Sequence, residues 1–151
     1  MKDIGLFIGL AITLGLGLWN AYMNYKSSRI TTFINTVTSQ RIKWIEQLRQ
    51  DISLFSGLTY NFSASNMDDK PQDVEMLKEI DRLRHVIRLR LNPEGEYDKI
   101  IENLIFEIPK YTHYHYKDTL KEKLNELIIA TQHLLKTEWE KVKSESMHKN
   151  I

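Results

Sequence analysis

Basic side chains are concentrated in one stretch near the middle of the chain, and they are its clearest candidates for chemistry. They are Arg82, Arg84, His85, Arg88 and Arg90. Clustered guanidinium groups bind phosphates and other anions. At helical spacing only Arg84 and Arg88 share one flank, which makes that pair a candidate anion-binding site. Glu79 and Asp81 stand three or four residues before basic partners, so the favoured interpretation is a solvated face of paired charges.

Two histidines stand close enough in sequence to share a metal ion. His113 and His115 are separated by one tyrosine, but a zinc site needs three or four protein ligands. The nearest carboxylate, Asp118, is better placed to cap the helix that follows. We therefore predict no metal site. The chain also shows no phosphate-binding glycine loop and no nucleophile or paired-carboxylate motif, so we expect neither an enzyme nor a cofactor.

The composition bears on several further functions. The 151 residues carry 21 Lys and Arg against 20 Asp and Glu, a net charge of +1. That balance alone argues neither for nor against nucleic acid, but no aromatic residues interleave the arginines, so we expect no nucleic-acid partner. There are no cysteines, which excludes disulfides, thiol catalysis and cysteine-bound zinc and suits a reducing compartment.

The longest feature of the sequence precedes all of these residues. From Ile4 to Tyr25 it carries 22 residues without a charge, and as a helix these span roughly 33 Å, enough for a hydrocarbon core of about 30 Å. Its end holds aromatic rings that favour the headgroup level, followed by basic residues. The predicted membrane-interface residues are Trp19, Tyr22, Tyr25, Lys26 and Arg29. The pattern predicts a transmembrane helix over residues 4–25.

A cleaved signal peptide is the main alternative to this helix. It would require a clearly basic start, a shorter apolar core and a small-residue cleavage site. Here Asp3 offsets Lys2, and the apolar core is too long, so we expect the segment to remain as an anchor. Basic residues follow it, and no acid occurs before Glu46. That excess places the following part in the cytoplasm and the N-terminus outside, in a single-pass topology.

Small residues recur every four positions along this segment. The stripe consists of Gly5, Gly9, Thr13, Gly17 and Ala21. Lipid supplies no hydrophobic drive for helices to associate, and close backbone packing along small residues often takes its place. We therefore predict self-association, or pairing with another membrane helix, through this stripe. Glycine is also common in membrane helices generally, and Gly15 lies off the stripe, so a silent stripe is the alternative.

After the membrane segment the apolar residues keep helical spacing. We predict a neck helix over 26–58 that continues the membrane helix, with a kink near Ser27–Ser28. Its apolar seam is narrow at first and broadens from Trp44 onward. A seam of that shape is typical of a coiled-coil-like neck that leads into a bundle.

The remaining sequence predicts three more helices with short links. A polar surface loop covers 59–72, and Asp73 caps the helix that follows. Asn92–Gly95 forms a turn, and Pro109 stops the next helix. The predicted fold class is all-α: a transmembrane helix, a long neck, and a cytosolic helical bundle completed by residues 73–147.

Two tryptophans stand in similar charged frames, one in the neck and one in the last helix, and we expect each ring in the core. The first frame, Arg-x-x-Trp-Ile-x-x-Leu-Arg, consists of Arg41, Trp44, Ile45, Leu48 and Arg49. The second, Leu-Lys-x-Glu-Trp-Glu-x-x-Lys, consists of Leu135, Lys136, Glu138, Trp139, Glu140 and Lys143. With these frames the chain resembles a widespread group of small, largely uncharacterised bacterial proteins that carry an N-terminal membrane helix.

The resemblance implies a place in the bacterial inner membrane. Because genes of this type lie among mobile elements and defence loci, it also implies a role in anti-phage defence. The predicted function is a membrane-anchored, self-associating helical scaffold or effector, a homo-oligomer in the lipid bilayer with a protein partner from a neighbouring gene. The first alternative is a membrane-linked sensor that binds a nucleotide-type anionic ligand through the arginine-rich helix, and the second is a plain membrane tether for a soluble enzyme.

Overall fold

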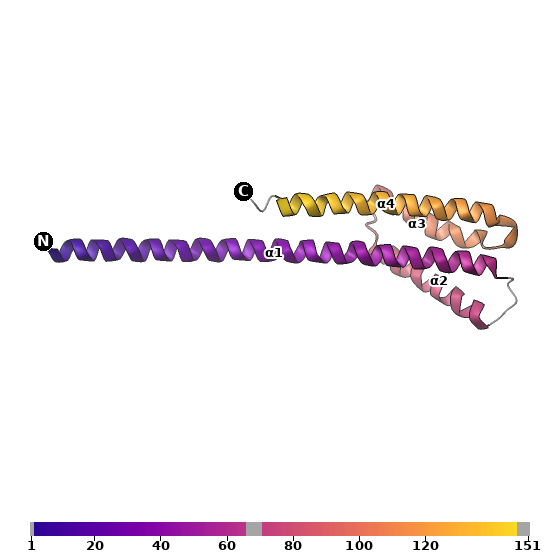
Figure 1. Ribbon diagram of the computed structural model, residues 1–151, viewed down its shortest axis with the longest axis horizontal. Coiled ribbons are helices and arrows are strands. Elements are labelled where there is room, and N and C mark those ends of the chain that lie inside the picture. The colour runs from indigo at the N-terminus through magenta and orange to yellow at the C-terminus, as the bar shows by residue number, and fades with distance from the viewer. Residues whose placement is uncertain (1, 66–70, 148–151) are drawn as a thin grey trace.

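The computed structural model describes residues 2–65 and 71–147, and all regular structure within them is helical. One helix, α1 (Lys2–Ala64), runs along the whole molecule, and its 63 residues span about 95 Å. Figure 1 shows no other described helix beside its N-terminal half, whereas its C-terminal half is packed in a bundle. The all-α helical bundle predicted from the sequence is confirmed.

Three further helices complete the bundle. They are α2 (Pro71–Arg90), α3 (Glu96–Glu107) and α4 (Lys117–Met147), with the short 3-10 helices η1 (Ile108–Tyr111) and η2 (Tyr114–Tyr116) between the last two. α2 and α4 pack against α1, and α3 packs against α4. Because α4 runs antiparallel to α1, its C-terminal end lies beside the middle of the long helix (Figure 1).

The core draws large apolar side chains from all four helices, at the helical spacing that the sequence shows. Fully buried examples are Leu48, Phe55, Leu83, Ile87, Ile101, Ile105, Leu120 and Leu127. The first core residue of α1 is Ile45, which is 4% exposed. The narrow apolar stripe of the neck helix therefore broadens into a buried face at Trp44–Ile45, as predicted.

α1 is one uninterrupted helix, and two predictions about it are wrong. The expected kink near Ser27–Ser28 is absent, because the helix continues across both serines. The predicted helix end at residue 58 is also wrong, since α1 continues to Ala64. Thr59 and Phe62 are buried, and the Thr59 hydroxyl donates to the carbonyl oxygen of Phe55 at 2.7 Å. Because these residues pack into the core, the helix continues through residues 59–64 although most of that segment is polar.

The start of α2 differs from the prediction in a similar way. The helix begins at Pro71, whose fixed φ suits a first helical position. Asp73 therefore lies inside the first turn and is not the cap. Its side chain is buried, and within the described residues its Oδ2 atom has no hydrogen-bond partner. The positive end of the helix dipole still favours a carboxylate at this position.

The predicted turn at Asn92–Gly95 is confirmed, and a buried carboxylate organises it. Asp98, in the first turn of α3, accepts a hydrogen bond of 2.8 Å at Oδ1 from the backbone N–H of Asn92. Gly95 lies against the same carboxylate, because a Cβ atom at that position would stand 2.1 Å from Asp98 Oδ2. The turn thus needs glycine for close approach, since the backbone φ of −73° suits any residue.

Candidate self-association surface

The N-terminal part of α1 carries large exposed apolar side chains, and no other helix of the described residues lies beside this stretch (Figure 1). Their exposed fractions range from 46% to 72%. They are Ile4, Phe7, Ile8, Leu10, Ile12, Leu14, Leu16, Leu18, Trp19, Tyr22, Met23 and Tyr25. With 3.6 residues per turn, these positions cover every side of the helix rather than one stripe. Contiguous apolar surface of this extent marks a site of contact with lipid or protein.

No helix within the described residues has both the length and the apolar character required to cross a membrane. The predicted transmembrane helix at 4–25 is therefore not supported by the structure. Where this stretch meets the neck, the guanidinium group of Arg29 lies over the ring of Tyr25, 5.0 Å from its centroid. The other aromatic rings predicted for the interface, Trp19 and Tyr22, are exposed.

The small-residue stripe is open along the described chain. A Cβ atom added at Gly5, Gly9 or Gly17 would meet nothing within 4 Å. The Thr13 hydroxyl donates to the carbonyl oxygen of Gly9 at 2.9 Å, which holds its polar atom against its own helix. Glycine inside a helix costs about 1 kcal/mol relative to alanine, and no contact within the described residues requires glycine at these three positions.

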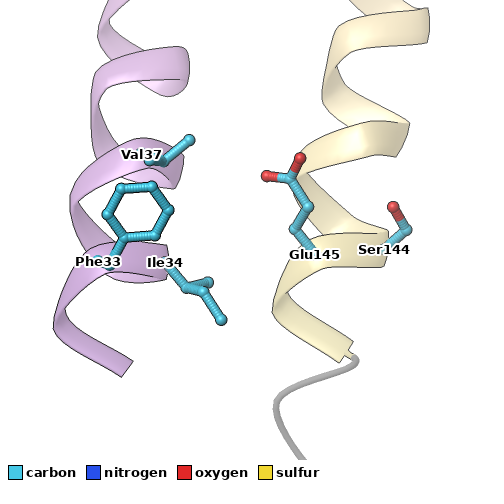
Figure 2. Close-up of a pocket in the computed structure, with 5 residues that line it drawn as sticks. All are labelled: Phe33, Ile34, Val37, Ser144 and Glu145. Atoms are coloured by element: carbon cyan, nitrogen blue, oxygen red, sulfur yellow. The ribbon is translucent and has the colours of Figure 1, made fainter. Parts of the chain in front are cut away.

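An apolar groove opens where the neck meets the end of α4 (Figure 2). Its volume is about 450 Å³, and its lining consists of Phe33, Ile34 and Val37 from α1 with Ser144 and Glu145 from α4. Figure 2 shows Ile34 directed toward α4 and Glu145 directed toward α1, whereas Ser144 points away. Phe33 is 69% exposed. The end of α4 therefore leaves the apolar side chains of the neck incompletely covered.

An ion-pair cluster fastens α4 to the neck beside this groove. Arg41 lies 2.5 Å from Glu145, between Nη1 and Oε1, and 3.5 Å from Glu138, between Nε and Oε2. Glu138 also pairs with Lys141. The side chains of Arg41 and Glu138 are 25% and 18% exposed, so solvent screens this pair less than a fully exposed one. Sequence spacing could not reveal the Arg41–Glu145 contact, which joins residues 104 positions apart.

The candidate anion-binding pair does come together, but on an aromatic ring. The guanidinium groups of Arg84 and Arg88 lie over Phe106, 5.1 Å and 6.0 Å from its centroid. Arg84 pairs with Asp81 at 2.9 Å, and Arg88 pairs with Glu102 at 2.6 Å. Each charge is therefore already neutralised by a carboxylate, which leaves little attraction for an anion. Phe106 was not identifiable from the sequence, because α3 supplies it.

The other arginines of α2 point elsewhere, as the helical spacing predicts. Arg82 donates two hydrogen bonds of 2.7 Å to Glu79, and these hold the pKa of the Glu79 carboxyl below its ordinary value. Arg90 reaches α1, where it pairs with Asp51 at 2.6 Å. Arg90 also lines a groove of about 790 Å³ with Arg41 and other residues. Both of those guanidinium groups hold carboxylate partners, and Lys141, which also lines the groove, pairs with Glu138.

His113 and His115, at the short helix η2, lie close to each other. The rings of His113 and His115 are stacked with centroids 4.9 Å apart, and their Nδ1 atoms are 3.0 Å apart. Within the described residues, no group of three or more potential ligands could hold a metal ion.

The two tryptophan frames lie against each other across α1 and α4, and Arg41 and Glu138 join them. Trp44 packs against the core, but Trp139 is 43% exposed, so the expectation of a core position is wrong for Trp139. Its ring lies on the rim of a groove of about 650 Å³ that Ile42 and Ile45 also line.

Comparisons with known proteins found no matching family model, no similar characterised protein and no similar solved structure.

Proposed function

We propose that this chain is a membrane-anchored, self-associating helical scaffold or effector, inserted once in a bacterial inner membrane with its bundle in the cytoplasm. One observation carries the proposal: the part of α1 that no other described helix contacts exposes apolar side chains on every side. Its residues 4–25 also carry no charge. Such a surface is unfavourable in water and favourable in lipid, at roughly 25 cal/mol per Å² of apolar area.

The two ends of the stretch suit a bilayer. Within the stretch, all of the Leu, Ile and Phe side chains belong to residues 4–18, and Trp19, Tyr22 and Tyr25 then provide rings suited to the headgroup level. Lys26 and Arg29 come next, and basic residues on this side favour a cytoplasmic bundle. Glycines and two asparagines make the stretch less apolar than a run of leucines. Packing against another helix covers that less apolar surface, which is why anchoring and self-association belong together in the proposal.

The role of the bundle is that of a binding body rather than a catalyst. Its four helices present salt-bridged charged faces, and its described histidines and carboxylates form no metal-ligand group. We propose that it engages a protein encoded by a neighbouring gene, in anti-phage defence, as the resemblance implies. The sensor alternative has less support, because Asp81 and Glu102 already occupy Arg84 and Arg88.

Membrane retention tests the proposal directly. The full chain should stay with bacterial inner membranes after washing with alkaline carbonate, which removes peripheral proteins. Leu14→Lys places a charge in the middle of the apolar stretch, at a cost of about 2.5–3.5 kcal/mol in lipid, and should release much of the protein. Leu54→Lys is the matched control, since Leu54 is also exposed but belongs to the bundle. Release of the parent chain by carbonate would overturn the anchoring.

Topology is a separate readout. A reporter fused after Ile151 that is active only in the cytoplasm should be active, whereas a reporter that needs an oxidising exterior should be silent. The opposite pattern would place the bundle outside and would reverse the orientation argued from Lys26 and Arg29.

A further inference from the structure

We propose that a second copy of this chain packs along α1, parallel and in register, and that the neck residues Phe33, Ile34 and Val37 are the cytoplasmic part of this contact. These three residues are called the neck seam below. The partner's neck seam completes the groove that α4 leaves open. The inference rests on the proposed membrane anchoring and adds to it the partner, its orientation and the residues at which the two copies meet.

The neck seam lies in line with the face of α1 that is buried farther toward its C-terminus, inside the bundle. Ile45 follows Val37 after eight residues, Leu48, Ile52 and Phe55 then follow at spacings of three or four, and all four are 0–4% exposed. α2 and α4 cover that face in the bundle. Near the membrane end of α4 the cover stops, and Phe33 and Val37 are 69% and 36% exposed. The seam thus has the chemistry of a helix interface without a complete partner in the described chain.

The size of the contact favours an entire helix as the occupant. The groove itself is short, since the α1 residues that line it span 33–37. A partner that also follows α1 down to Gly5 stays in contact over about 50 Å. A strip about 10 Å wide and that long covers roughly 500 Å² on each helix, so that both together approach the 1,000 Å² or so that a specific interface requires.

A second copy of α1 has the residues that this contact requires along its whole length. A helix that packs here must be uncharged and apolar in its membrane part, with small residues where the backbones come close. In its neck part it must present a narrow apolar seam. Copies anchored in one membrane are parallel, and Gly9 and Val37 are 28 residues, or four heptads, apart. If the two helices supercoil at about 3.5 residues per turn, both positions stay on the contact face, so that Gly9 lies opposite Gly9 and Val37 opposite Val37. Lys26 and Arg29 of the two copies also come near each other. Anionic lipid headgroups lie at that level and offset the repulsion.

The open glycines permit the close approach of a second backbone. Gly5, Gly9 and Gly17 each weaken the helix relative to alanine, yet a Cβ atom at any of them would meet nothing within the described chain. A facing backbone from a second helix is a contact that glycine permits and larger side chains prevent. Gly15 is equally open but lies off the stripe, which makes it a control.

Cysteine cross-linking tests the register, because the chain has no cysteine of its own. Val37→Cys and Phe33→Cys place a thiol in the neck seam. Ser39→Cys places one on an exposed position of the opposite face of the same helix. Each full-length variant is oxidised in membranes with copper phenanthroline, in which dioxygen accepts the two electrons released when two thiols form a disulfide. A parallel pair brings equivalent seam positions within the 4.4–6.8 Å Cα separation that a disulfide needs.

We expect Val37→Cys to give disulfide-linked dimers several-fold more efficiently than Ser39→Cys, with Phe33→Cys intermediate or equal to Val37→Cys. Adding Gly9→Ile should lower the yield at position 37, because a branched side chain separates the backbones, whereas adding Gly15→Ile should not. Equal yields from positions 33, 37 and 39, or no dimer from any, overturn the inference. The carbonate wash of the same membranes shows independently whether anchoring holds, so failure of the pairing and failure of the proposed function are distinguishable.

Discussion

The indole nitrogen of Trp44 donates a hydrogen bond of 2.9 Å to the carbonyl oxygen of Arg90, the last residue of α2. The final carbonyl groups of a helix have no partner inside that helix, so a side chain of α1 supplies one. The side chain of Arg90 reaches back to α1 through Asp51 and Gln47. Together these bonds fix the end of α2 on the long helix at the level where the bundle begins.

Replacing Trp44 with phenylalanine removes that hydrogen bond and part of the ring. We expect the full chain in mild detergent to lose about 1–2 kcal/mol of unfolding free energy. Trp139→Phe is the control, since that ring is 43% exposed, and it should cost clearly less. Denaturant unfolding followed by circular dichroism measures both. Equal losses would mean that the Trp44–Arg90 bond adds nothing to stability.

Two glycines of the bundle should respond to alanine with opposite signs. Gly95→Ala places a Cβ atom 2.1 Å from Asp98 Oδ2, so the buried carboxylate must move and its bond to the Asn92 amide must break, at a cost of about 1–3 kcal/mol. Gly57→Ala meets nothing within 4 Å inside α1 and should stabilise the helix by up to about 1 kcal/mol. The same unfolding measurement decides, and a stabilising Gly95→Ala would contradict the close approach described here.

The double variant Arg84→Ala, Arg88→Ala separates the structural role of these arginines from anion binding. It removes one ion pair within α2, one between α2 and α3, and the cover of Phe106. Exposed ion pairs and cation–π contacts each contribute up to about 1 kcal/mol, so we expect a loss of about 1–2 kcal/mol. Titration with ATP, followed by calorimetry, should show no saturable binding to the parent chain. Saturable binding that the double variant loses would instead favour the sensor function.

The acid side of the pH profile should report the Glu79–Arg82 pair. Its hydrogen bonds lower the pKa of Glu79 below its ordinary value of 4.5. The pair therefore contributes its stability above that value and loses it as the pH falls through the lowered pKa. Carboxyl carbon shifts measured by NMR should show a low pKa in the parent and a return toward 4.5 in Arg82→Ala. An unchanged Glu79 titration in that variant would rule out Arg82 as the cause.

The spacing of apolar residues was sufficient to predict the helices and their inward faces. Leu48, Ile87, Ile105 and Leu127 are buried because one face of each helix must leave water, and that requirement is visible in the sequence. The ends of helices were harder to place. α1 continues to Ala64 because Thr59 and Phe62 find neighbours to pack against, and those neighbours become known only when the helices are assembled.

At the candidate site, too, contacts within one helix could be predicted from the sequence, whereas contacts between helices could not. Intrahelical pairs such as Arg82–Glu79 follow from a spacing of three residues. Contacts between helices do not, because the sequence does not specify which faces meet. Phe106 beneath Arg84 and Arg88 comes from the next helix, α3, and Glu145 beside Arg41 comes from α4, 104 positions later. The exposure of Trp139 has the same origin, since its frame resembles that of Trp44 while its position in the assembled bundle differs.

The continuity of α1 makes the neck a rigid post. From Tyr25 to Trp44 the helix rises about 28 Å, so on the proposed anchoring the bundle lies that far from the lipid surface. Its rotational orientation about the axis of α1 is also fixed relative to the membrane helix. Removing or adding a single neck residue turns the bundle by about 100° relative to the membrane helix, whereas seven added residues restore its direction and lift it by about 10 Å. A protein that docks on the bundle from the membrane plane must therefore reach this height, and neck length and phase can be varied independently to measure how strictly it does so.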